Sequence, residues 1–291
     1  MRRATRLILI ILATMLLLIG CGSGNQQPQL GGSTEPKEGG TLVLGDSWSV
    51  VTMDPAMYND DGSWHVINNV FDALVAHNSK RAIIPRLAES WENPDNNTWI
   101  FHLRKDARWQ DGNEVFPEGE GPEVTAEDVK YSIERILDPA TRSARVTLVN
   151  SVDKVEVIDK YTVKITTKEP DAFLLDNLAS VYIVNKQIIE TLGPEKFARN
   201  PIGSGPFKFE EMKPDDYVSL VRNEDYYIKP NLERIIIKPI PDPNALLIAL
   251  ESGDVDVVAQ VPQKDVERIE ADPNLEVMRQ ATAAYRYMAF H

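Results

Sequence analysis

Cys21 is the only cysteine among the 291 residues, and this limits how the folded chain can be stabilised. An exported protein often uses disulfide bonds, but a single cysteine has no partner within its own chain. The folded state must therefore rest on a packed hydrophobic core. A chain of this length is long enough to build one or two such cores.

The first 20 residues have the pattern of a secretory signal. Three arginines within the first six residues precede an apolar run that ends at Ile19, and this run is shorter than the roughly 20 residues that span a bilayer. The run closes with Leu18-Ile19-Gly20-Cys21, which resembles the lipobox of bacterial lipoproteins. We therefore expect a signal peptide at 1–20 and a lipidated Cys21. The alternatives are an ordinary signal with an incidental cysteine, or an uncleaved anchor.

The charge of the chain argues against some classes of partner. The chain carries 31 basic and 44 acidic residues, a net charge of −13. Loss of residues 1–20 would remove three arginines and leave 28 basic against 44 acidic residues, a net charge of −16. Such an acidic body is not expected to bind nucleic acid or an anionic lipid surface. An acidic surface is also common among soluble proteins, so the net charge does not identify a ligand.

Composition and periodicity divide the rest of the chain. Residues 22–40 are rich in Gly, Ser, Gln, Pro, Glu and Thr and predict a flexible tether. A folded α/β body with mixed sheets should follow, and its segment 234–258 is expected to form a right-handed parallel strand–helix–strand crossover. Hydrophobic spacing and capping residues predict strands at 41–44, 98–104, on both sides of Asp159-Lys160, 206–209, 217–221, 234–240, 255–258, 275–278 and 285–290, and helices at 66–75, 125–137, 243–252 and 262–269.

Four segments in order resemble one family, the extracellular solute-binding proteins of family 5, which are oligopeptide-, dipeptide- and nickel-binding components of ABC importers. The segments are Trp91–Gly112 with its Trp-x-x-Pro-Asp and Trp-x-Asp-Gly elements, Val124–Ser132, Pro201–Phe207, and Ile248–Asp256. The resemblance runs from about Thr41 to His291. The extra acidic residues at 113–123 depart from the family pattern and predict an exposed loop.

The resemblance implies a periplasmic-binding-protein-like (type II) fold, of which this chain would hold the first lobe and lack the second. The main part of that lobe is expected at 41–60 and 168–284, with an inserted subdomain at 61–167. A crossover strand at 285–291 would lead toward the missing second lobe. An incomplete gene product without a transport role is the alternative to a fragment of an ordinary binding protein.

The resemblance also implies a function. A monomer, anchored outside the cytoplasm, would capture oligopeptides or dipeptides between two lobes and deliver them to an ABC permease. The alternatives are another solute, such as a nickel chelate or an oligosaccharide, and an anchored hydrolase. By position in the family, the expected ligand-binding residues are Trp48, Ser49, Val50, Tyr182, Ser204, Tyr285, Arg286 and Tyr287. Tyr182 and Tyr287 could equally be core residues, and Gly203-Ser204-Gly205 a plain loop.

The sequence carries no recognisable motif for catalysis, metal binding or cofactor binding. The chain has no phosphate-binding Gly-x-x-x-x-Gly-Lys-Ser/Thr loop and no Gly-x-Ser-x-Gly nucleophile elbow. His65, His77, His102 and His291 lie far apart without a His-Glu-x-x-His pattern. Carboxylates are abundant, but nothing selects an acid/base pair. We therefore expect no catalytic residue, no metal and no cofactor.

Overall fold

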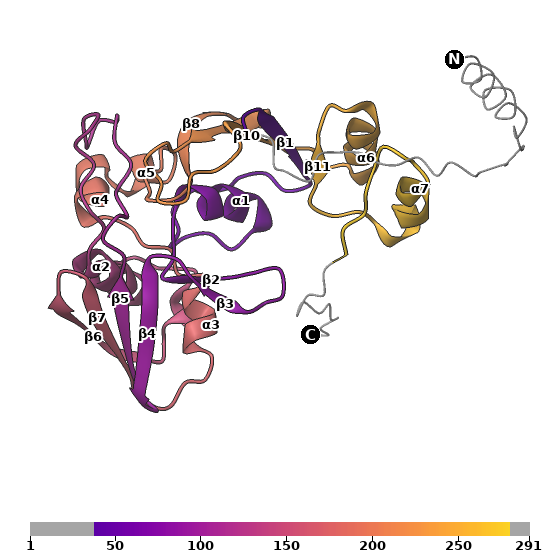
Figure 1. Cartoon of the computed structure of the whole chain (residues 1–291). Coiled ribbons are helices and arrows are strands. Elements are labelled where there is room, and N and C mark those ends of the chain that lie inside the picture. Colours follow the sequence, from indigo (N-terminus) through magenta and orange to yellow (C-terminus); the bar gives the residue numbers. More distant parts are fainter. Residues whose placement is uncertain (1–37, 280–291) are drawn as a thin grey trace, which may run out of the picture. The chain divides into compact units, whose positions relative to one another are not determined.

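A computed structural model describes residues 38–279 of the chain, and Figure 1 shows the arrangement of its elements. They form a five-stranded sheet of order β11-β1-β10-β9-β8, a four-stranded sheet of order β4-β5-β7-β6, and the hairpin β2-β3. The strands are β1 (Thr41–Asp46), β2 (Val75–His77), β3 (Ile83–Pro85), β4 (Ala88–Asp95), β5 (Thr98–Leu103), β6 (Val152–Asp159), β7 (Thr162–Thr167), β8 (Phe207–Lys213), β9 (Tyr217–Arg222), β10 (Arg234–Pro239) and β11 (Val257–Val258).

Helices connect and cover these sheets. They are α1 (Asp61–Val70), α2 (Ala126–Leu137), α3 (Leu174–Leu178), α4 (Lys186–Leu192), α5 (Pro194–Phe197), α6 (Pro243–Ser252) and α7 (Val266–Glu270), with short 3₁₀ turns at Val146–Leu148 and Gln263–Asp265. The predicted α/β class with mixed sheets is confirmed.

The five-stranded sheet is mixed because β1 lies between two parallel neighbours. β1 pairs in parallel with β10 on one side and β11 on the other, whereas β9 pairs antiparallel with both β10 and β8. Helix α6 connects β10 to β11 and packs on β1, where a Cβ at Gly45 would lie 2.6 Å from Leu246 Cδ1. The parallel crossover predicted for 234–258 is therefore confirmed, while its handedness stays a prediction.

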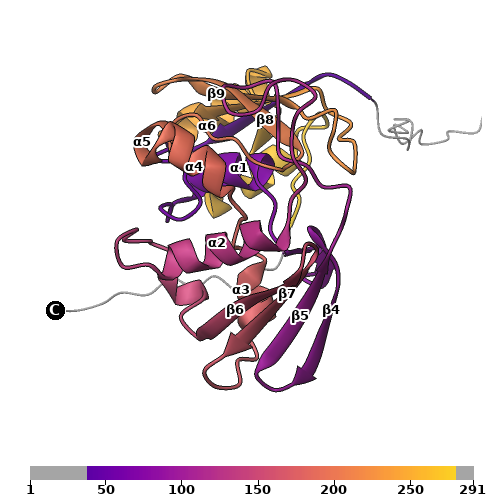
Figure 2. The same cartoon turned by 90° about the vertical axis from the view of Figure 1, so that its left-hand side faces the viewer.

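The capping signals in the sequence mark α2 and α6 correctly. Asp128 Oδ2 accepts a hydrogen bond from the Thr125 backbone N–H at 2.8 Å, which closes the first turn of α2. Asp242 is the N-cap of α6, and its Oδ1 accepts the backbone N–H groups of Asn244 and Ala245 at 3.0 and 2.8 Å. Gly253 ends α6 in the left-handed conformation with φ of 80°. Figure 2 shows α2 lying across the four-stranded sheet, where it packs on β6 and β7.

Two predicted elements are wrong. The helix expected at 66–75 is α1, which begins five residues earlier, behind Asp60, and ends at Val70. Its helical period runs on to Leu74, but Phe71 turns extended and Ala73 forms a bridge with Tyr182. Pairing with a distant segment thus overrides the local helical period.

The strand expected at 275–278 is irregular, because no described strand pairs with it. The strand expected at 285–290 lies outside residues 38–279.

One continuous hydrophobic core serves both larger sheets. It includes Phe101 and Val163 from the four-stranded sheet and Leu220 and Ile237 from the five-stranded sheet. Helix α1, which falls inside the predicted subdomain, packs against β8, β9 and β10. We therefore propose that the inserted subdomain begins after Val70 rather than at residue 61.

Candidate functional site

The conformation of the loop that follows β1 is fixed by contacts with the first turn of α1. The N–H groups of Val51 and Thr52 donate to Ser63 Oγ at 3.0 and 3.1 Å. A Cβ at Gly62 would lie 2.8 Å from the Trp48 carbonyl oxygen and 2.7 Å from that of Ser49, so only glycine allows this approach. The loop therefore keeps one conformation while the Trp48 side chain remains 54% exposed.

A buried carboxylate at the end of β1 also fixes the conformation of this loop. Asp46, the last residue of β1, is 2% exposed, and its Oδ1 accepts the Trp48 backbone N–H at 3.1 Å. Its Oδ2 lies 3.2 Å from Nε2 of His65, on α1. Burial lowers the pKa of His65, against the opposing fields of Asp46 and Asp61. Near neutral pH the histidine is therefore uncharged, and Asp46 Oδ2 lies beside it as a buried acceptor that has no hydrogen-bond partner among residues 38–279.

Trp64 is the second partly exposed tryptophan of this region. Its ring is 38% exposed on α1, and its Nε1–H donates to the Tyr182 hydroxyl at 3.0 Å. That hydroxyl donates in turn to Asn68 Oδ1 at 3.1 Å. Burial raises the pKa of Tyr182, which keeps the phenol neutral. This chain of hydrogen bonds orients the indole, so one face of Trp64 is presented in a fixed position.

A cation without an acidic partner lies beside these rings. The Tyr58 and Tyr182 ring centroids are 6.3 Å apart, and Arg145 Cζ lies 4.4 Å from the centroid of Tyr58. The Arg145 Nε is buried without a hydrogen-bond acceptor, and no carboxylate within residues 38–279 pairs with this guanidinium. Burial raises the pKa of Tyr58, although Arg145 opposes the shift. We call Trp48, Tyr58, Trp64, Arg145 and Tyr182 the aromatic face.

Such a face suits an organic solute with a carboxylate. Aromatic rings bury apolar area and stack on planar groups, and a guanidinium without an acidic partner can form two parallel hydrogen bonds with a carboxylate. The described residues contain no cluster of three or more histidine, cysteine or acidic side chains that could hold a metal ion. Within the same range, no helix has the length and apolar character of a membrane span.

Ser204 lies at the far end of α1. The Gly205 N–H donates to the Val70 carbonyl oxygen at 2.9 Å, and a Cβ at Gly203 would lie 1.9 Å from that oxygen. A helix of ten residues is about 15 Å long, so Ser204 and the Trp48 loop are at opposite ends of it. Ser204 is 1% exposed. The two parts of the predicted site are thus not brought together.

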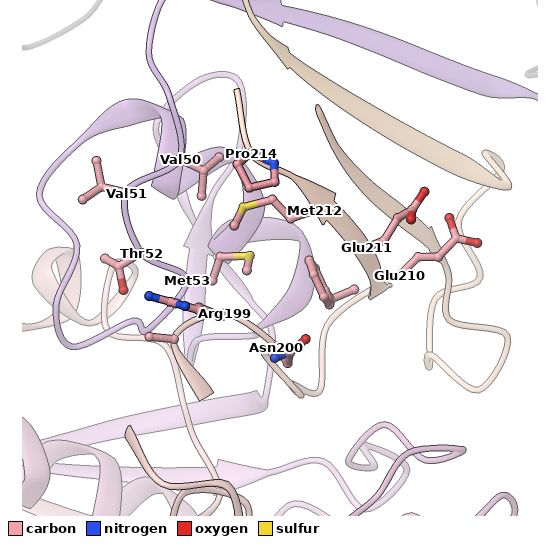
Figure 3. A pocket seen from close by; sticks show the side chains of 12 residues that line it. Val50, Val51, Thr52, Met53, Arg199, Asn200, Glu210, Glu211, Met212 and Pro214 are labelled. Carbon is pink, nitrogen blue, oxygen red and sulfur yellow. The ribbon is translucent and has the colours of Figure 1, made fainter. Parts of the chain in front are cut away.

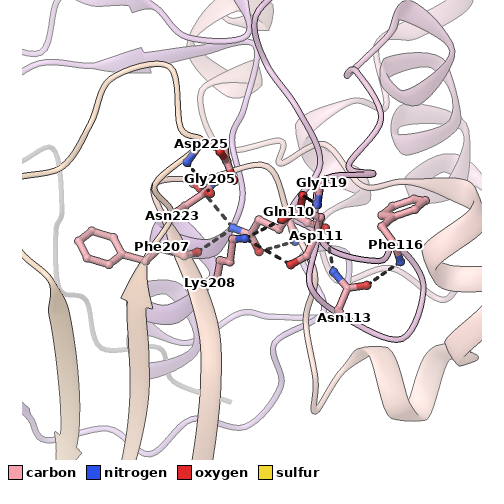
Figure 4. A network of polar contacts seen from close by, with 11 residues as sticks. Gln110, Asp111, Asn113, Phe116, Gly119, Gly205, Phe207, Lys208, Asn223 and Asp225 are labelled. Carbon is pink, nitrogen blue, oxygen red and sulfur yellow. Dashed lines mark hydrogen bonds and ion pairs between the residues drawn. The ribbon is translucent and has the colours of Figure 1, made fainter.

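Gln110 fastens the glycine loop to the five-stranded sheet (Figure 4). Its buried amide donates to the Phe207 and Gly205 carbonyl oxygens at 2.8 and 3.2 Å, and its Oε1 accepts the Gly203 N–H at 3.1 Å. Asn223 donates to Gly205 O at 3.0 Å. This network supports a structural role for residues 203–205, which is the plain-loop alternative for this segment.

The remaining predicted residues divide into three groups. Trp48 and Ser49 are exposed on the loop after β1, whereas Val50 is half-buried and lines a hollow together with Met53 and Met212 (Figure 3). Tyr182 is 5% exposed and supports Trp64. Cys21, Tyr285, Arg286 and Tyr287 lie outside residues 38–279. The ligand-binding role of every one of these residues stays a prediction.

Sequence reasoning missed four residues of this region: Tyr58 and Trp64, which contact Tyr182, Arg145, which lies on Tyr58, and His65, which lies beside Asp46. One signal was available: α1 carries Trp64 away from its buried stripe of Val66, Ile67 and Val70, and an outward tryptophan is uncommon without a purpose. Arg145 gave no such signal, because its position beside Tyr58 depends on the tertiary fold.

Comparison with known proteins shows which proteins the chain is similar to. A sequence profile described as "Bacterial extracellular solute-binding proteins, family 5 Middle" matches residues 82–291. The oligopeptide-binding protein AppA of Bacillus subtilis is 28% identical over 303 aligned positions, which cover 100% of this chain and 54% of AppA.

Two solved structures have a similar fold. Helicobacter pylori DppA, in complex with the peptide STSA, superimposes with a TM-score of 0.74 and 29% identity, over 82% of this chain and 50% of DppA. Campylobacter jejuni NikZ, in complex with Ni(L-His), gives 0.69 and 30%, over 80% of this chain and 45% of NikZ. The chain spans about half the length of the curated relatives it matches.

Proposed function

The chain belongs to the bacterial extracellular solute-binding proteins of family 5, and from this premise we propose that it is part of the substrate-binding component of an ABC importer. It would capture a short peptide and deliver it to the membrane permease. The fold is the one found in type II periplasmic binding proteins. Members of this family bind solutes rather than transform them, so we propose no enzymatic activity.

The aromatic face carries the proposal. Trp48 and Trp64 are exposed to 54% and 38% on segments that Ser63 and Tyr182 hold in place. Rigid, exposed aromatic rings lose little entropy when a ligand stacks on them. Arg145 supplies the charge that a peptide C-terminal carboxylate needs. We propose that the backbone and C-terminus of a short peptide are recognised here, as DppA of H. pylori and AppA of B. subtilis were solved with peptides bound.

Isothermal titration of the full chain with a dipeptide-to-pentapeptide library, and with C-terminally amidated copies, tests the proposal. We expect binding of free-acid peptides, weaker by about tenfold or more in Arg145→Gln, because a hydrogen bond to a charged group contributes about 1.5–3 kcal/mol. Amidated peptides should be insensitive to this substitution. Arg81→Gln, an exposed arginine on the β2–β3 turn, is the matched control.

A second substitution tests the aromatic contribution. Trp64→Ala should weaken all peptides, since stacking area is lost whatever the C-terminus carries, while Trp91→Ala, on β4, serves as the control. Binding of Ni(L-His) without any peptide binding would transfer the proposal to the nickel-chelate alternative. Absence of heat with every peptide and chelate would refute the assignment of the aromatic face.

We further propose that the protein is an extracytoplasmic, monomeric lipoprotein. The pattern of residues 1–20, the cysteine that follows and the polar segment 22–40 support this, as does the extracellular character of the family. In a bacterial host, labelled palmitate should be incorporated into the wild-type chain and not into Cys21→Ser, which should also leave the membrane fraction. Equal labelling of both chains would contradict lipidation at Cys21.

A further inference from the structure

We propose that the hollow between residues 50–53 and the β8–β9 hairpin binds a small amphipathic carboxylate, an acid with an aliphatic or aromatic tail. The hollow is not a part of the aromatic face, and its evidence is independent of the peptide proposal. Its volume is about 630 Å³, inside the range of roughly 300–1,000 Å³ that is usual for small-molecule sites.

Apolar side chains line most of the hollow. Val50 and Met53 contribute from the segment after β1, and Phe209, Met212 and Pro214 contribute from β8 and the turn that follows it. Figure 3 shows Val50, Met53, Met212 and Pro214 grouped around the space. Two flexible thioethers in one wall adapt to tails of different shape. These walls favour a hydrocarbon or aromatic group over a sugar or an inorganic ion.

Arg199 supplies the charge selectivity. Its side chain lines the hollow and is exposed, and within residues 38–279 its guanidinium has no hydrogen bond or ion pair. The two glutamates at the rim are engaged elsewhere. Glu210 binds Arg234 at 3.1 Å and Ser219 at 2.7 Å, and Glu211 accepts from the Tyr217 hydroxyl at 2.6 Å. An occupant that carries a carboxylate would satisfy the one uncommitted cation of this hollow.

The walls are preformed. The Met53 N–H donates to the carbonyl oxygen of Ala198, next to Arg199, at 2.9 Å. Val51 and Thr52 are bonded to Ser63 on α1, and β8 is paired with β9 up to the turn, at Lys213 and Tyr217. A site whose walls are ordered beforehand loses less conformational entropy when it binds.

Calorimetric titration with octanoate, and with octanamide as its uncharged counterpart, tests the inference. We expect octanoate to bind the wild-type chain more tightly than octanamide. Arg199→Gln should reduce the octanoate affinity at least about tenfold and leave octanamide unchanged. Lys196→Gln is the matched control, because Lys196 is a nearby cation that pairs with Glu114 instead of lining this hollow; it should bind octanoate like the wild type.

A second variant tests the position of the tail. Met212→Glu places a negative charge in the apolar wall and should abolish octanoate binding with an unchanged circular dichroism spectrum. Equal affinity for octanoate and octanamide, no binding of either, or an Arg199→Gln variant with wild-type octanoate affinity would each overturn the inference. Octanoate binding without peptide binding would refute only the peptide proposal, and Trp64→Ala, which lies outside the hollow, should not alter octanoate affinity.

Discussion

At the scale of single residues, several polar side chains hold the fold in positions where water cannot reach them. Asp54 is 2% exposed and forms two hydrogen bonds, of 2.8 and 2.5 Å, with the guanidinium of Arg135 on α2. This pair ties the segment after β1 to the helix that covers the four-stranded sheet. A buried ion pair is not a large net gain in itself, but the loss of one partner leaves the other charge without compensation.

We predict that Arg135→Met lowers the free energy of unfolding by about 3–5 kcal/mol, because Asp54 then stays buried and unpaired. Lys130→Met on the same helix is the control. Its ammonium lies 4.0 Å from Glu134 at the exposed surface, and its loss should cost no more than about 0.5 kcal/mol. Urea unfolding at pH 7, followed by circular dichroism, measures both. Similar losses in the two variants would contradict the argument.

His65 makes a pH-dependent contribution of known sign. Because burial lowers its pKa in the folded chain, the unfolded chain takes up the proton first as the pH falls. The folded state therefore loses stability as the pH falls through the usual histidine pKa of about 6.5 toward the lowered value, by at most about 1.4 kcal/mol per pH unit.

We predict that the stability difference between the wild type and His65→Gln shifts in favour of the variant as the pH is lowered from 7.5 to 5. Taking the difference cancels the contributions of the other titrating groups that both chains share. Urea unfolding at half-unit pH steps measures it. A difference that does not change with pH, or that shifts in favour of the wild type, would show that the Asp46 charge outweighs burial at His65.

At the scale of elements, α1 is the support on which separate segments meet. Its first turn holds the loop after β1, its exposed side carries Trp64, and its last residue contacts the glycine loop at 203–205. Gln110 completes the last of these contacts from the other side. The hydrophobic stripe of α1 is buried in the common core, so these contacts are made by a helix that is itself rigid.

We predict that Gln110→Leu lowers the free energy of unfolding by about 1–3 kcal/mol for each buried group that it leaves unsatisfied, the Gly203 N–H first among them. Asn93→Ala is the control, because its amide also makes two hydrogen bonds to backbone oxygens but at the exposed end of a hairpin. It should cost less than about 1 kcal/mol. Thermal and urea unfolding compare the two, and an equal effect would mean that Gln110 is not a buried clamp.

At the scale of the whole molecule, the described chain has one main core, and the α6–α7 segment does not belong to it. The main core joins the two larger sheets. Five buried residues of the α6–α7 segment are not members of that core: Leu246, Leu247, Val255, Val266 and Ile269. The two-residue strand β11, the packing of α6 on β1, and the hydrogen bonds between Asp256 and Val43 connect this segment to the five-stranded sheet.

We predict that residues 243–270 unfold locally while the main core stays folded. The free energy of this local unfolding should be lower than the free energy of unfolding the main core. Hydrogen exchange followed by mass spectrometry should show peptides from α6 and α7 exchanging before those from β5, β7 and β9. Equal protection in both sets would show that the chain unfolds as one cooperative unit. Addition of octanoate or peptide should not change this order, because neither proposed site includes α6 or α7.

The local features of the sequence were sufficient for most elements, including both strands of the β8–β9 hairpin, α2 behind Thr125, and α6 between Pro243 and Gly253. Helix caps, turns and hydrophobic periods act over a few residues, so these elements can be predicted from the local sequence. The family could be predicted from the sequence for a similar reason, since its motifs are short and occur in order. The end of α1, the separation of Ser204 from Trp48 and the gathering of Trp64, Tyr182 and Arg145 could not be predicted in this way. Each depends on contacts between distant segments, such as the hydrogen bond between Trp64 and Tyr182, 118 residues apart, and only the packed core brings such segments together.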